Sequence, residues 1–183
     1  MYPRCVVFGI GNESRGDDAL GPLLVERLKT KIEELSLGNF LTFISDFQLQ
    51  IEHTLDLQNQ ELALFIDAGV PPAILESEPF SFNRLSTIQA RKAMSHALLP
   101  GELMGIASSY FADEQYEKES KLESNTSSHL PEAYILCIRG YEFELGAEAS
   151  KKSLQNLDLA FNKLISWLAQ KYPFITGDSS CTK

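Results

Sequence analysis

The stretch CVVFGIGNESRGDDALG, residues 5–21, decides the fold of this chain. Its first six residues form an apolar run that contains a glycine near its end, which is typical of a buried β-strand. A polar loop follows, and apolar residues then recur at helical spacing from Ala19 to Leu35. Asp17 or Asp18 can cap this helix at its N-terminus. A buried strand, a loop and an amphipathic helix in this order indicate the first unit of an α/β domain.

The same alternation continues along the rest of the chain. The predicted strands cover residues 40–45, 62–66, 79–84 and 134–138, the third of them at a sheet edge. The predicted helices cover residues 51–57, 100–111 and 151–170. The polar, acidic stretch 112–132 is predicted to be a loop. Strands that alternate with helices favour an α/β fold with a mostly parallel, twisted sheet covered on both faces.

The length of 183 residues indicates a single domain. The sequence contains no internal repeat and no linker long enough to separate two domains. We expect the domain to span residues 1–171, and residues 172–183 to form a flexible tail, because the last helical pattern ends before them. Hydrophobic residues make up 44% of the chain, enough for a substantial core, which excludes a disordered protein.

The chain is acidic, with a formal net charge of −9 and an isoelectric point near 4.8. Nucleic-acid binding requires clustered Lys and Arg, so the charge argues against that class and favours a protein or a cation as partner. No apolar stretch approaches the roughly 18 residues of a membrane helix. The three cysteines lack the spacing of a disulfide framework or a zinc site. These features predict a cytoplasmic protein without a membrane segment.

Parallel strands place their carboxyl ends at one edge of a sheet, where α/β proteins bind ligands. The loop after Ile10 and Asp67 both fall at this edge. Gly9 and Gly11 alone suggest a dinucleotide site, but the third glycine is missing and the GDD aspartates would repel a phosphate. A tight turn with a helix cap is the alternative interpretation, and it explains only one aspartate of the pair.

Three side chains are candidates for a metal site. Asp67 follows a buried strand, where a helix cap or a partner for a backbone amide is an equally ordinary role. His96, in SHALLPG, is a single histidine of the kind that has many structural roles. Together, Asp18, Asp67 and His96 supply two carboxylates and one imidazole. This set suits a borderline divalent ion such as nickel or zinc and leaves coordination positions open.

Other chemistry has less support. His53 has Glu52 and Asp56 as sequence neighbours, which predicts a local ion pair rather than a ligand role. Serine catalysis is disfavoured because the chain lacks a GxSxG elbow. Cysteine catalysis is disfavoured because Cys5 and Cys137 lie in the middle of predicted strands. Attack by water is therefore the default for any hydrolysis, with a metal-activated water and an aspartate general base both open.

Four stretches resemble, in this order, the motifs of the hydrogenase maturation endopeptidase family: GIGNESRGDDALG, LFIDAG, SHALLPGELMGIA and IRGYEFELGAEAS. The resemblance extends from Cys5 to Ala169 and implies a single-domain, three-layer α/β/α fold. It implies an endopeptidase that removes the C-terminal extension of a nickel-iron hydrogenase large-subunit precursor after nickel insertion. A non-catalytic hydrogenase assembly chaperone and a nucleotide-dependent α/β enzyme are the alternatives.

The resemblance also implies the site and the partner. Asp18, Asp67 and His96 match the family's two acids and one histidine, which are its metal-binding and catalytic residues. The family often has glutamate where Asp18 stands, so the site here is one methylene shorter on that side. The nickel is carried by the precursor, which is the expected partner of a monomeric protein.

One departure from the family pattern concerns recognition. Many members carry an Asp-Gly-Gly-Thr-like stretch after the second strand, whereas this chain has DFQLQ at residues 46–50. The longer stretch DFQLQIEHTLDL resembles the subgroup that serves bidirectional, NAD-linked hydrogenases. We expect Phe47–Gln50 to contact the precursor.

Overall fold

The computed structural model describes residues 3–34, 40–85, 98–120 and 129–176. Its centre is a five-stranded sheet with the order β2-β1-β3-β5-β4. The strands are β1 (Cys5–Ile10), β2 (Leu41–Asp46), β3 (Leu62–Gly69), β4 (Phe80–Arg84) and β5 (Glu132–Arg139). All pairs are parallel except β4 with β5, which is antiparallel. The predicted α/β fold with a mostly parallel sheet and β4 at its edge is therefore confirmed.

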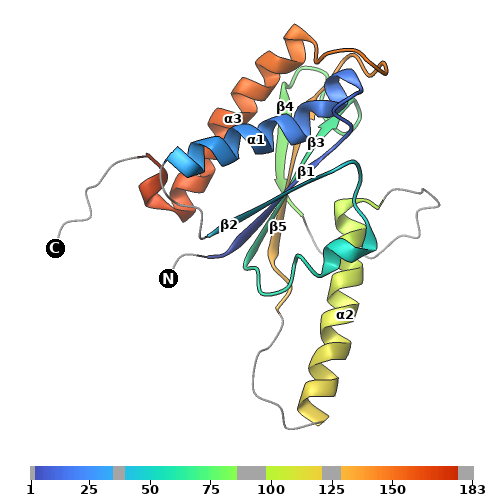
Figure 1. The fold of residues 1–183 in the computed structure, drawn as a ribbon, viewed down its shortest axis with the longest axis vertical. Helices are drawn as coiled ribbons and strands as arrows, with labels where there is room; N and C mark the ends of the chain where they lie inside the picture. The colour runs from blue at the N-terminus through green and yellow to red at the C-terminus, as the bar shows by residue number, and fades with distance from the viewer. Residues whose placement is uncertain (1–2, 35–39, 86–97, 121–128, 177–183) are drawn as a thin grey trace, which may run out of the picture.

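Helices cover both faces of the sheet, which gives the expected three layers (Figure 1). The helices are α1 (Leu20–Glu34), α2 (Pro100–Ser120) and α3 (Lys151–Lys171), with short 3₁₀ turns η1 (Gly16–Ala19), η2 (Ile51–Thr54) and η3 (Pro173–Thr176). One hydrophobic core lies between the sheet and α1 with α3, and the other lies between the sheet and α2 with the segment around η2. Burial of apolar surface on both faces is the main force that holds the layers together.

The first strand belongs to both cores. Alternate side chains of a strand point to opposite faces, so Val7 packs toward α1 while Val6 and Phe8 pack toward α2. Every residue of β1 is buried. This double burial explains why an uninterrupted apolar run, rather than an alternating pattern, encodes β1.

Several boundaries differ from the sequence prediction: β3 continues to Gly69, β5 begins at Glu132, and the helix predicted for residues 51–57 is the short turn η2. Residues 112–120, predicted as loop, continue α2 to Ser120. Alanine, glutamate, glutamine and lysine in this stretch favour helix even without an apolar face, which the polarity of the segment obscured. Residues 172–176, predicted as part of the tail, pack against the domain: Tyr172 and Ile175 lie in the core, and the Tyr172 hydroxyl donates to the carbonyl of Pro3 at 2.6 Å. Within the described ranges, no helix is both long and apolar enough to cross a membrane.

Candidate functional site

The start of α1 packs directly on the sheet because two glycines permit a close approach. A Cβ atom at Gly21 would lie 2.7 Å from the carbonyl oxygen of Ile66, and one at Gly9 would lie 2.7 Å from Cγ2 of Val25. A side chain at either position would force the helix away from the sheet. Because Gly9 and Gly21 have no side chains, η1 and the start of α1 lie against the carboxyl ends of β1 and β3, next to Asp67.

Asp18 lies in η1 at this edge and is partly exposed. Its Oδ2 atom accepts a hydrogen bond of 3.0 Å from the backbone N–H of Asn12. The backbone N–H of Asp18 donates to the carbonyl of Arg15 at 3.1 Å. Gly11 has a φ of 138°, and a side chain there would collide with the carbonyl oxygen of Asp18. The loop thus folds back tightly on Asp18 and orients its carboxylate.

Asp67 lies near the end of β3 and is largely buried. Its Oδ1 atom accepts a hydrogen bond of 2.8 Å from the N–H of Ala68. Burial raises the pKa of Asp67 to about 7; the Ala68 hydrogen bond opposes this rise, and the negative charge of Asp18 adds to it. Asp18 and Asp67 therefore lie close enough for their charges to interact. The sequence prediction that both would meet at one sheet edge is correct.

The two carboxylates are not neutralised by the described part of the chain. None of the ion pairs formed among the described residues includes Asp18 or Asp67. Among these residues, the second oxygen of each carboxylate also lacks a hydrogen-bond donor. Two neighbouring carboxylates in a partly buried place repel each other unless a proton or a cation lies between them. In the free protein, the raised pKa of Asp67 reflects this repulsion together with its burial.

The third predicted site residue, His96, lies outside the described residues. Within the described ranges, no three His, Cys, Asp or Glu side chains are grouped closely enough to hold a metal ion. The described residues thus bring together two of the three predicted ligands.

Asp17 has a different environment from its neighbour Asp18. It is fully buried and its carboxylate accepts hydrogen bonds from the connection between β5 and α3. Among the described residues, neither aspartate caps α1, so the sequence prediction of a helix cap there is wrong. The sequence does not reveal this role of Asp17 because its donors lie more than 120 residues away, and no local pattern signals them.

A second acidic group stands at the end of β2. Oδ2 of Asp46 lies 3.4 Å from Nε2 of the buried His53, whose Nδ1 accepts a hydrogen bond of 2.9 Å from the N–H of Gln50. The predicted ion pair of His53 with Glu52 or Asp56 is therefore replaced by a pair with Asp46. Since both ring nitrogens have partners, His53 ties η2 to the end of β2.

A hollow of about 270 Å³ adjoins this connection and the loop after β1. Its lining comprises Gly11, Asn12, Glu13, Pro22, Ser45, Asp46 and Phe47. The Phe47 side chain is 60% exposed, so an apolar ring stands beside an acidic hollow at the carboxyl edge of the sheet. The sequence places Phe47–Gln50 after a strand, but it does not reveal this hollow, which forms only when β1, β2 and α1 pack together.

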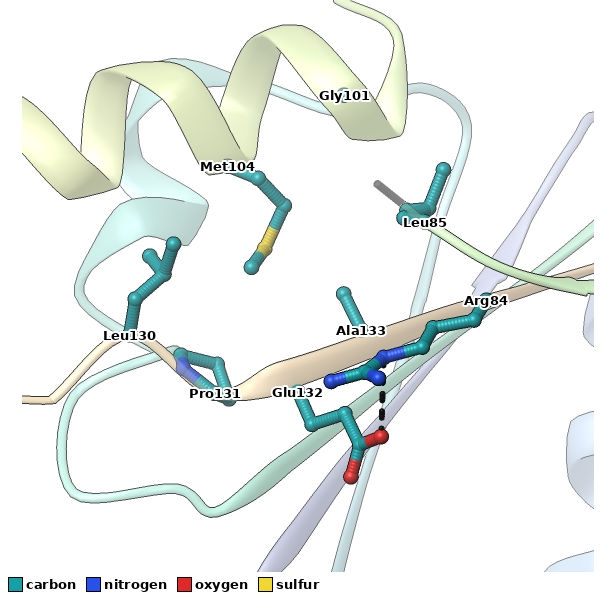
Figure 2. A pocket seen from close by; sticks show the side chains of 8 residues that line it. All are labelled: Arg84, Leu85, Gly101, Met104, Leu130, Pro131, Glu132 and Ala133. Carbon is teal, nitrogen blue, oxygen red and sulfur yellow. Dashed lines mark ion pairs between the residues drawn. The ribbon is translucent and has the colours of Figure 1, made fainter. Parts of the chain in front are cut away.

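A hollow of about 240 Å³ lies at the opposite end of the sheet (Figure 2). Apolar side chains, including Met104 and Leu130, face it, and an ion pair between Arg84 and Glu132 at 3.0 Å lies on its floor. Glu132 begins β5, whereas Asp67 pairs with Cys137, five residues further along, which corresponds to about 16 Å of strand. This hollow is therefore separate from the carboxylate pair.

The described cysteines are unsuited to nucleophilic catalysis. Cys5 and Cys137 are buried, and burial raises the pKa of each thiol to about 12. A nucleophilic cysteine requires a thiolate, which a raised pKa disfavours. The structure thus agrees with the prediction that Cys5 and Cys137 are not catalytic nucleophiles.

Several solved protein structures have the same overall fold as this chain. The hydrogenase maturating endopeptidase HybD from E. coli superposes with a TM-score of 0.61 at 16% identity, covering 91% of this chain and 93% of that protein. The chain has the fold of the hydrogenase maturation proteases. The [NiFe] hydrogenase maturation protease HycI from Thermococcus kodakarensis KOD1 matches with a TM-score of 0.57 at 21% identity, covering 92% and 94% of the two chains.

A third protein with this maturation-protease fold is the hydrogenase 2 maturation peptidase from Thaumarchaeota archaeon SCGC_AB-539-E09. It matches with a TM-score of 0.55 at 18% identity and covers 90% of this chain and 97% of that one. Comparisons with protein-family models and with curated protein sequences find no match. The similarity to the maturation proteases is therefore one of three-dimensional structure, over nearly the whole length of both chains.

Proposed function

We propose that this protein is an endopeptidase that removes the C-terminal extension of a nickel-iron hydrogenase large-subunit precursor after nickel insertion. The observation that carries the proposal is the interacting pair Asp18 and Asp67, which lies at the carboxyl edge of a sheet with the maturation-protease fold. Ligands of such sheets bind at this edge. The sequence motif around His96 adds an imidazole to the proposed set.

In this proposal, nickel belongs to the substrate. Asp18 and Asp67 each offer a carboxylate oxygen, and His96 offers a nitrogen. Three donors of this kind leave coordination positions for ligands from the precursor. The ion would then join the two proteins and place the scissile bond beside the carboxylates, and an empty precursor would bind poorly.

Asp67 is the better of the two general-base candidates. In the metal-free protein its pKa is about 7, so its carboxylate takes up a proton more readily than an ordinary aspartate, and the oxygen that does not bind nickel would accept the proton. In the proposed step, the oxygen of a water molecule attacks the scissile carbonyl carbon while Asp67 takes a proton from that water. The proton then passes to the leaving amine as the carbon–nitrogen bond breaks. The chain supplies the proton transfer and the orientation of the groups.

The hollow beside Phe47 supports a recognition role for residues Phe47–Gln50. Asp46 and its partner His53 hold this segment at the same edge as Asp18. A precursor that approached the carboxylates would therefore meet the exposed ring of Phe47. Subgroup specificity toward bidirectional, NAD-linked hydrogenases would reside in this segment.

The test compares nickel-loaded with nickel-free precursor, each purified and mixed with this protein in metal-free buffer. Mass spectrometry should show loss of the C-terminal peptide from the nickel-loaded precursor alone. Asp18→Ala, Asp67→Ala and His96→Ala should each abolish this loss while the variants remain folded. Equal processing of both precursors would refute the nickel requirement. Stable binding without any loss of mass would instead identify an assembly chaperone.

A further inference from the structure

Asp17 makes the densest set of hydrogen bonds around any described carboxylate. Oδ2 accepts from the N–H of Tyr141 at 2.6 Å, from the N–H of Glu142 at 3.0 Å and from the hydroxyl of Ser150 at 3.0 Å. Oδ1 accepts from the N–H of Ser150 and from the hydroxyl of Ser153, both at 2.6 Å. A fully buried carboxylate is costly unless it is satisfied in this way.

These bonds outweigh the effect of burial on the charge. Burial alone would raise the pKa of Asp17, but the hydrogen bonds from Ser153, Ser150, Glu142 and Tyr141 hold it below its ordinary value. Asp17 is therefore a permanent anion at neutral pH, which strengthens each hydrogen bond that it accepts.

The backbone on both sides of Asp17 is held by the same connection between β5 and α3. The N–H of Asp17 donates to the carbonyl of Glu142 at 2.7 Å, and the N–H of Gly16 donates to the carbonyl of Ala147 at 3.0 Å. A Cβ atom at Gly140 would lie 2.9 Å from Cβ of Asp17, so the connection touches the η1 turn directly. The η1 turn therefore has little freedom to shift while this network is intact.

Asp18 is the next residue along this turn, and its carboxylate faces the other way, toward Asn12 and Asp67. We propose that Asp17 is a positioning residue that holds Asp18 in place against Asp67 by tying η1 to the connection between β5 and α3. This inference rests on the proposed function for its catalytic consequence. Its structural part concerns the position of Asp18 and is independent of the substrate.

The hydrogen bond from Asn12 to Asp18 provides a direct measure of that position. In a ¹⁵N-labelled sample, hydrogen exchange of the Asn12 amide reports whether the Asp18 carboxylate still accepts its bond. Asp17→Asn keeps the size of the side chain but replaces one acceptor oxygen with a donor, which faces at least two other donors in either orientation of the amide. We expect exchange of the Asn12 amide to accelerate about tenfold or more, the factor that corresponds to loss of a hydrogen bond to a charged group.

The catalytic measurement uses the nickel-loaded precursor. Displacement of a reacting group by about 1 Å costs roughly 100-fold in rate, so kcat should fall by about that factor for Asp17→Asn. KM should change by a smaller factor than kcat, since Asp17 is buried and acts on the precursor only through the position of Asp18. Ser153→Ala removes one donor from Asp17 and should produce the same changes to a smaller extent, which keeps the proposal testable if Asp17→Asn does not fold.

Two controls separate positioning from general destabilisation. Leu164→Ala opens a cavity in the core, eleven residues beyond Ser153 on α3 and about 16 Å along the helix. This variant should have a lower melting temperature, while kcat and the exchange rate of the Asn12 amide should keep their wild-type values. Asp158→Asn makes the same chemical change as Asp17→Asn at an exposed site on α3 and should alter neither.

The outcomes are distinct. Loss of Asn12 protection in Asp17→Asn and Ser153→Ala, but not in Leu164→Ala, would support the positioning role. Unchanged Asn12 exchange in the Asp17 network variants, or an equal loss of kcat in Leu164→Ala at equal stability, would overturn it. If the wild-type protein leaves the precursor intact, the proposed function fails, whereas the Asn12 measurement still decides whether Asp17 positions Asp18.

Discussion

Replacing Asp67 with asparagine should make the metal-free protein more stable at neutral and alkaline pH. Asparagine has nearly the same shape as aspartate and its Oδ1 atom can still accept from the Ala68 N–H, but it carries no charge. The change therefore removes an anion that is largely buried and that faces a second anion, Asp18. Function and stability conflict at such a site. The negative charge that would bind a cation lowers the stability of the fold when no cation is bound.

The magnitude follows from the pKa of Asp67, which is about 7 in the folded protein against an ordinary value of 3.8. The difference corresponds, at about 1.4 kcal/mol per pH unit, to about 4 kcal/mol of destabilisation at pH 8. Because the folded state binds the proton more tightly than the unfolded state, stability falls as the pH rises from about 4 to about 7. Above pH 7, both states are deprotonated and the penalty is constant.

Urea denaturation of wild type and Asp67→Asn at pH 5 and pH 8, with a chelator present, measures this effect. The free energy of unfolding of the variant should exceed that of wild type by about 3 kcal/mol more at pH 8 than at pH 5. Asp56→Asn, at an exposed position, is the control and should stay within about 0.5 kcal/mol of wild type. A difference between wild type and Asp67→Asn that is the same at both pH values would refute the reasoning.

Three further predictions concern other parts of the molecule. Gly11→Ala should lower the free energy of unfolding in urea by more than about 1 kcal/mol, because a side chain there meets the Asp18 carbonyl at an unfavourable φ. Gly101→Ala, whose Cβ would enter open space at the start of α2, should cause no loss, and equal losses would contradict the argument. In the native protein, thiol reagents should leave Cys5 and Cys137 unlabelled, which peptide mass spectrometry checks; covalent inhibition traced to either thiol would show that water is not the nucleophile. A glycine-rich replacement of residues 47–50 should change which precursors bind more than it changes the melting temperature, and unchanged selectivity in a binding assay would argue against a recognition role.

The parts of the fold that the sequence predicts are those with strong local signals. Apolar runs such as residues 5–10 and 62–66 mark strands that are buried on both faces, and the rule that parallel strands share a carboxyl edge brings Asp18 and Asp67 together. The same local logic is wrong for residues 112–120. Their polarity suggests a loop, while their intrinsic preference for helix extends α2.

The parts that the sequence does not predict depend on contacts between distant segments. The two adjacent aspartates of GDD are alike in sequence, yet Asp17 is buried among donors from α3 and the preceding connection, and Asp18 faces the site. His53 likewise pairs with Asp46 at the end of β2, rather than with Glu52 or Asp56, its acidic neighbours in the sequence. Such partners are set by tertiary packing, which leaves no periodic pattern in the sequence.

The bonds between Asp17 and Ser153 join positions separated by 136 residues, and this separation has a consequence for biosynthesis. During synthesis, β1 and α1 leave the ribosome long before α3. A nascent chain at that stage contains both Asp17 and Asp18 but not the donors for Asp17. A buried anion without donors is unfavourable, and closing so long a loop is a slow step in folding. The η1 turn therefore acquires its final geometry only after the last helix docks. Until then the nascent chain carries no correctly placed pair of Asp18 and Asp67.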